Sequence, residues 1–210
     1  MNVLILASAS PRRREILANA RIPFIVMTQE ASETLPESVR TPEDTVRYLS
    51  YRKAEAAAER ILSGQDVPES PDPCGCVFVV GADTIVASDE MILGKPADEE
   101  DAYRMLKRLS GRQHDVFTGV TILKIAECRV LERDTFFEKT AVFVEPMTDR
   151  EIRWYISTKE PMDKAGAYGI QGVFSRFIGR IEGDYSNVVG LPVAALSRHL
   201  DRIGFRLYEQ

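Results

Sequence analysis

The chain has 210 residues, of which 44% are hydrophobic, and this is enough apolar sequence for a buried core. Its 27 Lys and Arg stand against 32 Asp and Glu, so the formal net charge of −5 argues against a broad basic surface for long nucleic acid. No apolar run approaches the ~18–20 residues that span a bilayer, and the start lacks the pattern of a secretion signal. Composition therefore predicts a cytoplasmic globular protein that binds neither membranes nor long nucleic acid.

The first motif is a run of three arginines at the start of an expected helix. Residues 3–6 predict a buried strand, Ser10 is a candidate N-cap and Pro11 suits the first helical position. The arginines at 12–14 then occupy the first turn, where the helix dipole makes each cation unfavourable by about 0.3–1 kcal/mol. A bound anion reverses this effect, because backbone amides and guanidinium groups would face it together. With Ser8 nearby, the segment predicts a phosphate-binding turn, and a solvated basic turn is the alternative.

The rest of the chain alternates between helices and strands. Expected strands cover 22–27, 77–80, 85–87, 116–125, 130–144 and 174–181, and expected helices cover 42–62, 98–109, 149–158 and 192–203. Thr41 and Thr148 are the expected N-caps of two of these helices. Residues 63–76 contain three prolines and two glycines and predict a surface loop insertion. The mixed order predicts one α/β domain over 1–210, with a mixed sheet flanked by helices.

Two charged residues stand at expected strand ends or turns. Asp83 follows the expected strand 77–80, where it would line the ligand crevice at the carboxyl edge of a sheet. A carboxylate there can act as a general base or hold a cation, and an ordinary turn contact is the alternative. Lys95, between a glycine and a proline, is either a point charge for phosphate oxygens or an exposed loop lysine.

A glycine-rich segment covers residues 160–172, with three glycines in its last seven residues. Glycines permit close approach of the backbone to a ligand. Tyr168 offers a stacking face, and Gln171 offers both a hydrogen-bond donor and an acceptor, as recognition of a nucleotide base requires. An ordinary surface loop is the alternative. The loop 183–192 has a similar composition and is a weaker candidate for the same role.

The cysteines and histidines predict no metal centre. Cys74 and Cys76 form a lone C-x-C, and Cys128 lies in an apolar context typical of a buried or half-buried thiol. His114 and His199 are far apart in the sequence, which gives a histidine metal site or a catalytic triad little support.

Five ordered segments resemble the Maf family of nucleoside triphosphate pyrophosphatases: 8–13, 81–84, 94–96, 160–172 and 183–192. The resemblance implies hydrolysis between the α- and β-phosphates, with a divalent cation, Mg or Mn, as cofactor. It implies an elongated mixed sheet with a central cleft, similar to that of inosine triphosphate pyrophosphatases. Family members are housecleaning enzymes linked to septum formation and cell-division arrest, and many are homodimers.

The resemblance also implies roles for nine residues. The catalytic set is Asp83, Lys95, Arg13, Glu33 and Lys53, with Asp83 as the proton acceptor. The substrate-binding set is Ser8, Arg12, Thr84 and Gln171, and metal ligands are not assigned. The segments 81–84 and 168–172 are similar to the branch that acts on dTTP and UTP. A 7-methyl-GTP pyrophosphatase of the sister branch and a non-catalytic nucleotide-binding regulator of septation stay open as alternatives.

Overall fold

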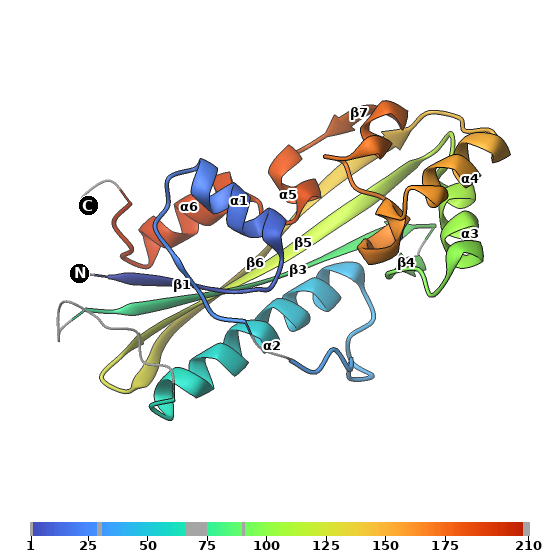
Figure 1. Ribbon diagram of the computed structural model, residues 1–210. Helices are drawn as coiled ribbons and strands as arrows, with labels where there is room; N and C mark the ends of the chain where they lie inside the picture. Colours follow the sequence, from blue (N-terminus) through green and yellow to red (C-terminus); the bar gives the residue numbers. More distant parts are fainter. Residues whose placement is uncertain (1, 29–30, 66–74, 90, 208–210) are drawn as a thin grey trace. The chain divides into compact units, whose positions relative to one another are not determined.

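The computed structural model describes residues 2–28, 31–65, 75–89 and 91–207 (Figure 1). Residues 66–74, most of the expected loop insertion and including Cys74, lie outside these ranges. The helices are α1 (Pro11–Asn19), α2 (Pro42–Leu62), α3 (Glu99–Leu109), α4 (Asp149–Ser157), α5 (Tyr185–Val189) and α6 (Val193–Arg202). The strands are β1 (Val3–Ala7), β2 (Ile25–Val26), β3 (Val77–Ser88), β4 (Met91–Leu93), β5 (Gln113–Ala126), β6 (Arg129–Val144) and β7 (Ile178–Glu182). Short 3-10 helices are η1 (Glu160–Asp163), η2 (Ala165–Ala167) and η3 (Val173–Phe177).

The seven strands form one mixed sheet in the order β2-β1-β3-β5-β6-β7, with β4 pairing β3 off this path. β1 runs parallel to β2 and β3, whereas β4 is antiparallel to β3 and β7 to β6. This confirms the expected α/β fold with a mixed sheet flanked by helices. Glu127 and Cys128, at φ 52° and 55°, make the two-residue turn between β5 and β6. Cys128 is exposed at this turn, so the expectation of a buried or half-buried thiol is wrong.

The chain divides into two compact units. Unit 1 consists of Met1–Asp83, Gly119–Phe137 and Gly190–Gln210, and unit 2 consists of Thr84–Thr118 and Glu138–Val189. The expected single domain over 1–210 stays a prediction. In the described part of the chain, no helix combines the length and the apolar character needed to cross a membrane.

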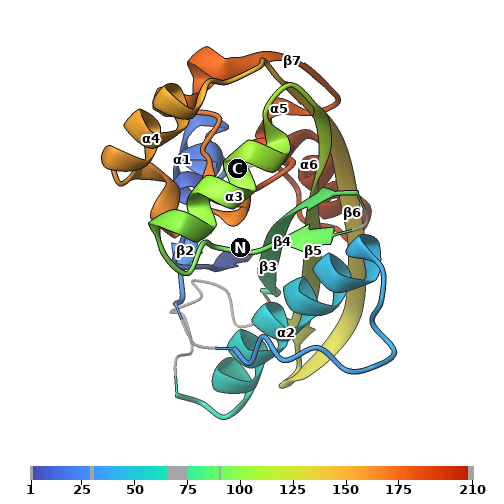
Figure 2. The same cartoon turned by 90° about the vertical axis from the view of Figure 1, so that its right-hand side faces the viewer.

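Unit 1 has three layers, with α1 and α6 on one face of its strands and α2 on the other (Figures 1 and 2). Successive side chains of a strand point to opposite faces. In β1, Leu4 and Leu6 accordingly join the core beneath α1 and α6, whereas Ile5 and Ala7 join the core beneath α2. Both faces of this strand are therefore buried, as its continuous apolar sequence predicts.

Helix α2 packs directly on the backbone of the sheet in unit 1. A Cβ atom placed on Gly81 of β3 would lie 2.3 Å from the Ser50 carbonyl oxygen and 2.5 Å from the Ala54 amide nitrogen. A Cβ on Gly119 of β5 would lie 2.2 Å from the Val46 carbonyl oxygen. The glycines therefore let the helix approach closer than any side chain would permit.

Unit 2 buries one apolar cluster between its helices and strands. The cluster includes Leu106 of α3, Ile152 and Tyr155 of α4, and Phe174 of η3. Asn187 of α5 is fully buried, and its Nδ2 donates to the Val116 carbonyl oxygen and to Thr140 Oγ1 at 3.1 Å and 2.9 Å. This part of the loop 183–192 therefore has a structural role.

Local signals predict the helix starts better than the strand bounds. Thr41 Oγ1 accepts from the Asp44 amide, and Thr148 makes a complete capping box, so both expected N-caps are confirmed. The expected strands 77–80 and 85–87 are one continuous strand, β3, because Gly81 serves helix packing and does not break the strand. The last strand, β7, begins at Ile178, since η3 precedes it.

Candidate active site

Arg13 is a buried cation held by two contacts from outside α1. Its Nε donates to the Gly190 carbonyl oxygen at 2.7 Å, and its Nη1 donates to Ser8 Oγ at 3.0 Å. Burial lowers the pKa of the guanidinium group, the negative charge of Asp83 raises it, and the positive charge of neighbouring Arg12 lowers it. Arginine keeps its proton in proteins, so Arg13 presents a fixed positive charge.

Ser8 organises the start of α1 in place of Ser10. Ser8 Oγ accepts from the Ser10 amide at 3.2 Å as well as from Arg13. Ser10 occupies the N-cap position, but its side chain makes no capping bond, so that part of the prediction is wrong. Arg12 and Arg14 are both half-buried in the same turn. Ser8 thus connects the helix start to the buried guanidinium group.

Lys53 connects two carboxylates in unit 1. Its Nζ contacts Asp83 Oδ1 and lies 3.1 Å from Glu33 Oε1. The Asp83 side chain is 12% exposed, that of Lys53 22% and that of Glu33 69%, so the pair of Lys53 and Asp83 is the shielded part. Salt bridges gain strength as solvent is excluded from them.

The sequence predicts Asp83 at the carboxyl end of a strand, and this is wrong. Asp83 lies inside β3, which continues to Ser88. It is placed instead by the packing of α2 on Gly81. The Ala54 amide faces Gly81, and Lys53 precedes Ala54 on that helix, so the ammonium group reaches the carboxylate two residues further along β3. A close helix–strand contact therefore builds the ion pair.

The unit 1 cluster can bind an anion and accept a proton. Arg12, Arg13 and Lys53 supply three positive charges against the two carboxylates of Asp83 and Glu33. Cations held in place in this way stabilise phosphate oxygens. In the described ranges, no group of three or more His, Cys, Asp or Glu residues is placed to hold a metal ion. Two carboxylates beside one ammonium group are the available oxygen donors.

The other three predicted site residues belong to unit 2, on separate segments. Thr84 is half-buried, and its Oγ1 lies 2.9 Å from Thr118 Oγ1. Lys95 is exposed between β4 and α3, and Gln171 is exposed between η2 and η3. The structure thus brings together the expected residues of unit 1. For Thr84, Lys95 and Gln171 it shows only the segment and the exposure of each.

The space beside each glycine of 166–172 is occupied by other side chains of the protein. A Cβ on Gly172 would lie 2.3 Å from Glu160 Oε1, and one on Gly169 would lie 2.7 Å from Lys164 Cε. Gly166, at φ 68°, faces Val86. The sequence predicts that these glycines let the backbone approach a ligand. In the structure they are instead explained by packing against the protein's own side chains.

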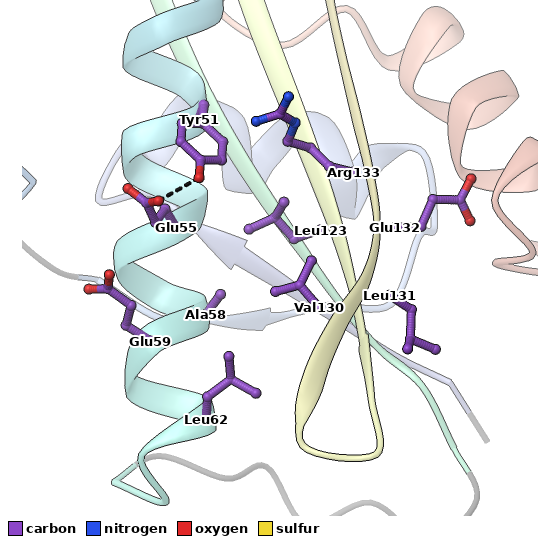
Figure 3. A pocket seen from close by; sticks show the side chains of 10 residues that line it. All are labelled: Tyr51, Glu55, Ala58, Glu59, Leu62, Leu123, Val130, Leu131, Glu132 and Arg133. Carbon is purple, nitrogen blue, oxygen red and sulfur yellow. Dashed lines mark hydrogen bonds between the residues drawn. The ribbon is translucent and has the colours of Figure 1, made fainter.

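A groove of about 490 Å³ lies in unit 1, between α2 and the β5–β6 hairpin (Figure 3). Figure 3 shows Ala58, Leu123 and Val130 directed into it. Its lining also includes Tyr51, whose hydroxyl donates to Glu55 Oε1 at 2.5 Å. None of the nine predicted site residues lines this groove.

Residue-by-residue interpretation misses Lys53 and Glu33, which the family resemblance alone supplies. A lysine inside a helix is usually solvated, and its partner Asp83 is 30 positions away. A usable signal was the run of small residues on α2, where Ser50 and Ala54 are fully buried and free the helix to approach a strand glycine.

A family model described as Maf-like protein matches residues 3–203. The chain belongs to the Maf family. The dTTP/UTP pyrophosphatase of Agathobacter rectalis is 46% identical over 97% of this chain and 98% of that protein. The proteins of the same name from Geobacillus sp. and Lachnoclostridium phytofermentans are 46% and 42% identical, over 98% and 100% of this chain and all of each relative. Among solved structures, the dITP/XTP pyrophosphatase of Mycobacterium abscessus is 12% identical over 95% of this chain and 96% of that one, with a TM-score of 0.42.

Proposed function

We propose that this protein hydrolyses dTTP and UTP between the α- and β-phosphates, releasing the nucleoside monophosphate and pyrophosphate. Full-length relatives at 42–46% identity that bear the name dTTP/UTP pyrophosphatase support this proposal. The structural observation that carries it is the shielded Asp83 carboxylate, which contacts the Lys53 ammonium group and lies in the field of Arg13.

In the proposed reaction, Asp83 accepts a proton from a water molecule as its oxygen attacks the α-phosphorus. A new P–O bond forms, the bond from the α-phosphorus to the bridging oxygen breaks, and pyrophosphate leaves with the electron pair. Lys53 and Arg13 stabilise the negative charge that develops on the phosphate oxygens. Because Ser8 and Gly190 already hold Arg13, little reorganisation is needed when the substrate binds.

The proposal includes a divalent cation, Mg or Mn. One or two carboxylates completed by substrate phosphates are the usual ligands of Mg²⁺, and Asp83 with Glu33 fits this donor set. Such an ion would neutralise phosphate charge when bound. Loss of activity with a chelator, and its return with added Mg²⁺ or Mn²⁺, tests this part.

In the proposal, Lys95 is a phosphate-binding residue, and Thr84 and Gln171 are substrate-selecting residues, as the family resemblance implies. Gln171 is exposed, and its amide carries a donor and an acceptor side by side. Uracil and thymine present a carbonyl beside an N–H, so one amide can pair with both. The proposal has Gln171 pair with this edge of the base and take part in substrate selection in that way.

The experiment that tests the proposal is hydrolysis of a nucleotide panel, with the products identified. Monophosphate plus pyrophosphate from dTTP and UTP is the expected result, and release of orthophosphate contradicts it. A preference for 7-methyl-GTP indicates the sister branch, and binding without turnover indicates a non-catalytic regulator.

The family resemblance extends the proposal to a cytoplasmic homodimer linked to septum formation. Light scattering on the purified protein measures the oligomeric state. Overproduction of the wild type beside Asp83→Asn, followed by measurement of cell length, tests whether division arrest needs catalysis.

A further inference from the structure

Two side chains of unit 2 hold the backbone on both sides of Gln171. The Tyr155 hydroxyl donates to Glu160 Oε1 at 2.9 Å, and this carboxylate oxygen lies 3.8 Å from the position of a Cβ on Gly169. Glu160 Oε2 accepts from the Val173 amide at 2.9 Å. Glu160, held by Tyr155, therefore bonds the backbone two residues after Gln171 and packs against Gly169, two residues before it.

Between these anchors the backbone makes a tight turn. The Gly172 amide donates to the Gly169 carbonyl oxygen at 3.3 Å, so Ile170 and Gln171 occupy the two central positions of a β-turn. The Glu160 carboxylate lies where a side chain on Gly172 would be. Gln171 is thus exposed at the tip of a turn whose base is closed by hydrogen bonds to Glu160.

The anchor itself is rigid. Tyr155 is fully buried on α4, and its ring lies 5.1 Å from that of Phe174. Burial and the adjacent Glu160 carboxylate raise the pKa of Tyr155, so the hydroxyl keeps the proton that it donates. A second anchor lies just before the turn, where Tyr168 Oη is 2.7 Å from His114 Nε2.

We infer that Tyr155 and Glu160 are positioning residues that fix the orientation of Gln171 and thereby set nucleotide selectivity. The selectivity part rests on the proposed function, whereas the hold on the turn does not. Loosening either anchor lets the turn sample other conformations, so the Gln171 amide is aligned with a base for less of the time. The phosphate-binding cluster of unit 1 is unchanged by such a loss.

The test compares Tyr155→Phe, Glu160→Ala and Glu160→Gln with the wild type. Hydrogen exchange of the peptide covering 168–173 reports on the turn without any substrate. Values of kcat and KM for dTTP, UTP, CTP and GTP report on selectivity. Tyr103→Phe and Glu182→Gln make the same chemical changes at other positions of unit 2 and serve as matched controls, and thermal unfolding verifies that each variant folds.

We expect faster exchange at 168–173 in Tyr155→Phe and Glu160→Ala. We also expect these variants to raise KM for dTTP and UTP roughly tenfold and to reduce the preference for them over GTP. Glu160→Gln keeps an acceptor for the Val173 amide, so we expect partial rescue. Unchanged exchange in folded variants overturns the inference whatever the activity. Faster exchange with unchanged selectivity overturns the positioning role and leaves the proposed function intact. If the wild type hydrolyses none of these nucleotides, the proposed function and the selectivity part fall together, and exchange alone decides whether the pair holds the turn.

Discussion

The charged cluster of unit 1 and the loop 160–173 of unit 2 are built in opposite ways. In the cluster, side chains on regular elements contact one another directly, since Lys53 of α2 and Asp83 of β3 meet where the helix packs on Gly81. In the loop, side chains shape the backbone, since Tyr155 and Glu160 close the base of the turn that carries Gln171.

This difference separates two requirements of a nucleotide hydrolase. Charge stabilisation needs cations at fixed distances, which a helix on a sheet provides. Selection among bases needs one donor–acceptor group at a set orientation, which an anchored turn provides. Changes in the cluster should therefore alter the rate for every nucleotide, and changes at the loop should alter the ratio between nucleotides.

The largest expected effect is that of Asp83→Asn, which removes the proposed proton acceptor from the cluster. We expect kcat for dTTP to fall roughly 10²–10⁴-fold, with nucleotide affinity changed little. Turnover and equilibrium binding are measured on the same preparation, with exposed Asp201→Asn on α6 as the control. Near wild-type turnover rules out Asp83 as the base.

Gly81→Ala tests whether helix packing builds the cluster. The new Cβ would lie 2.3 Å from the Ser50 carbonyl oxygen, so α2 must shift. We expect a loss of about 3 kcal/mol in the free energy of unfolding, together with reduced kcat. Gly94→Ala, which meets nothing within 4 Å, is the matched control in urea unfolding. Equal stability of the two variants contradicts the packing account.

Stability at low pH tests the second anchor of the loop. Burial lowers the pKa of His114 to about 4, so the folded state holds this side chain neutral. The unfolded chain, with a histidine pKa of about 6.5, binds the proton more readily, and stability falls as pH drops from about 6.5 to about 4. The shift corresponds to roughly 3 kcal/mol.

Urea unfolding at pH 7 and pH 4.5 measures this dependence. His114→Gln should lose most of the difference between the two pH values, and His199→Gln, on α6, should keep it. The same pH dependence in wild type and His114→Gln would show that other groups cause the loss.

A smaller effect is expected for Arg13→Lys, which keeps the positive charge but loses the planar guanidinium group that donates to Gly190 and Ser8. A lysine cannot contact Ser8 and Gly190 with one planar group, so we expect KM for dTTP to rise roughly tenfold. Arg14→Lys, in the same turn, is the control. Equal KM values for both variants would mean that the hold on Arg13 is dispensable.

Short-range signals explain what the sequence predicts well. Thr41 and Thr148 each accept a hydrogen bond from the amide three residues later, so each cap and its partner lie in one short stretch of sequence. The cluster depends on contacts across 30 residues or more, as between Lys53 and Asp83 or between Arg13 and Gly190. No local pattern reports such a contact, so Lys53 and Glu33 came from family resemblance alone, whereas local patterns indicated Arg13 and Asp83 one at a time.

The glycines show the same boundary between local and distant information. A glycine in a strand reads as a break, and the pairing of β3 shows that Gly81 lies inside a continuous strand. Glycines in a loop suggest space for a ligand beside the backbone, but at Gly172 the Glu160 carboxylate occupies that space. The conformational freedom of glycine is visible in a sequence, but the atom that uses the space is not.

The most direct test of this division of roles is the ratio of kcat/KM for dTTP to that for GTP, measured in Lys53→Met and Tyr155→Phe. Lys53→Met removes the ammonium group beside Asp83, so both values should fall by the same factor and the ratio should stay at its wild-type value. Tyr155→Phe should lower the ratio with a smaller change in kcat. A ratio that changes as much in Lys53→Met as in Tyr155→Phe would contradict the separation of charge stabilisation from base selection.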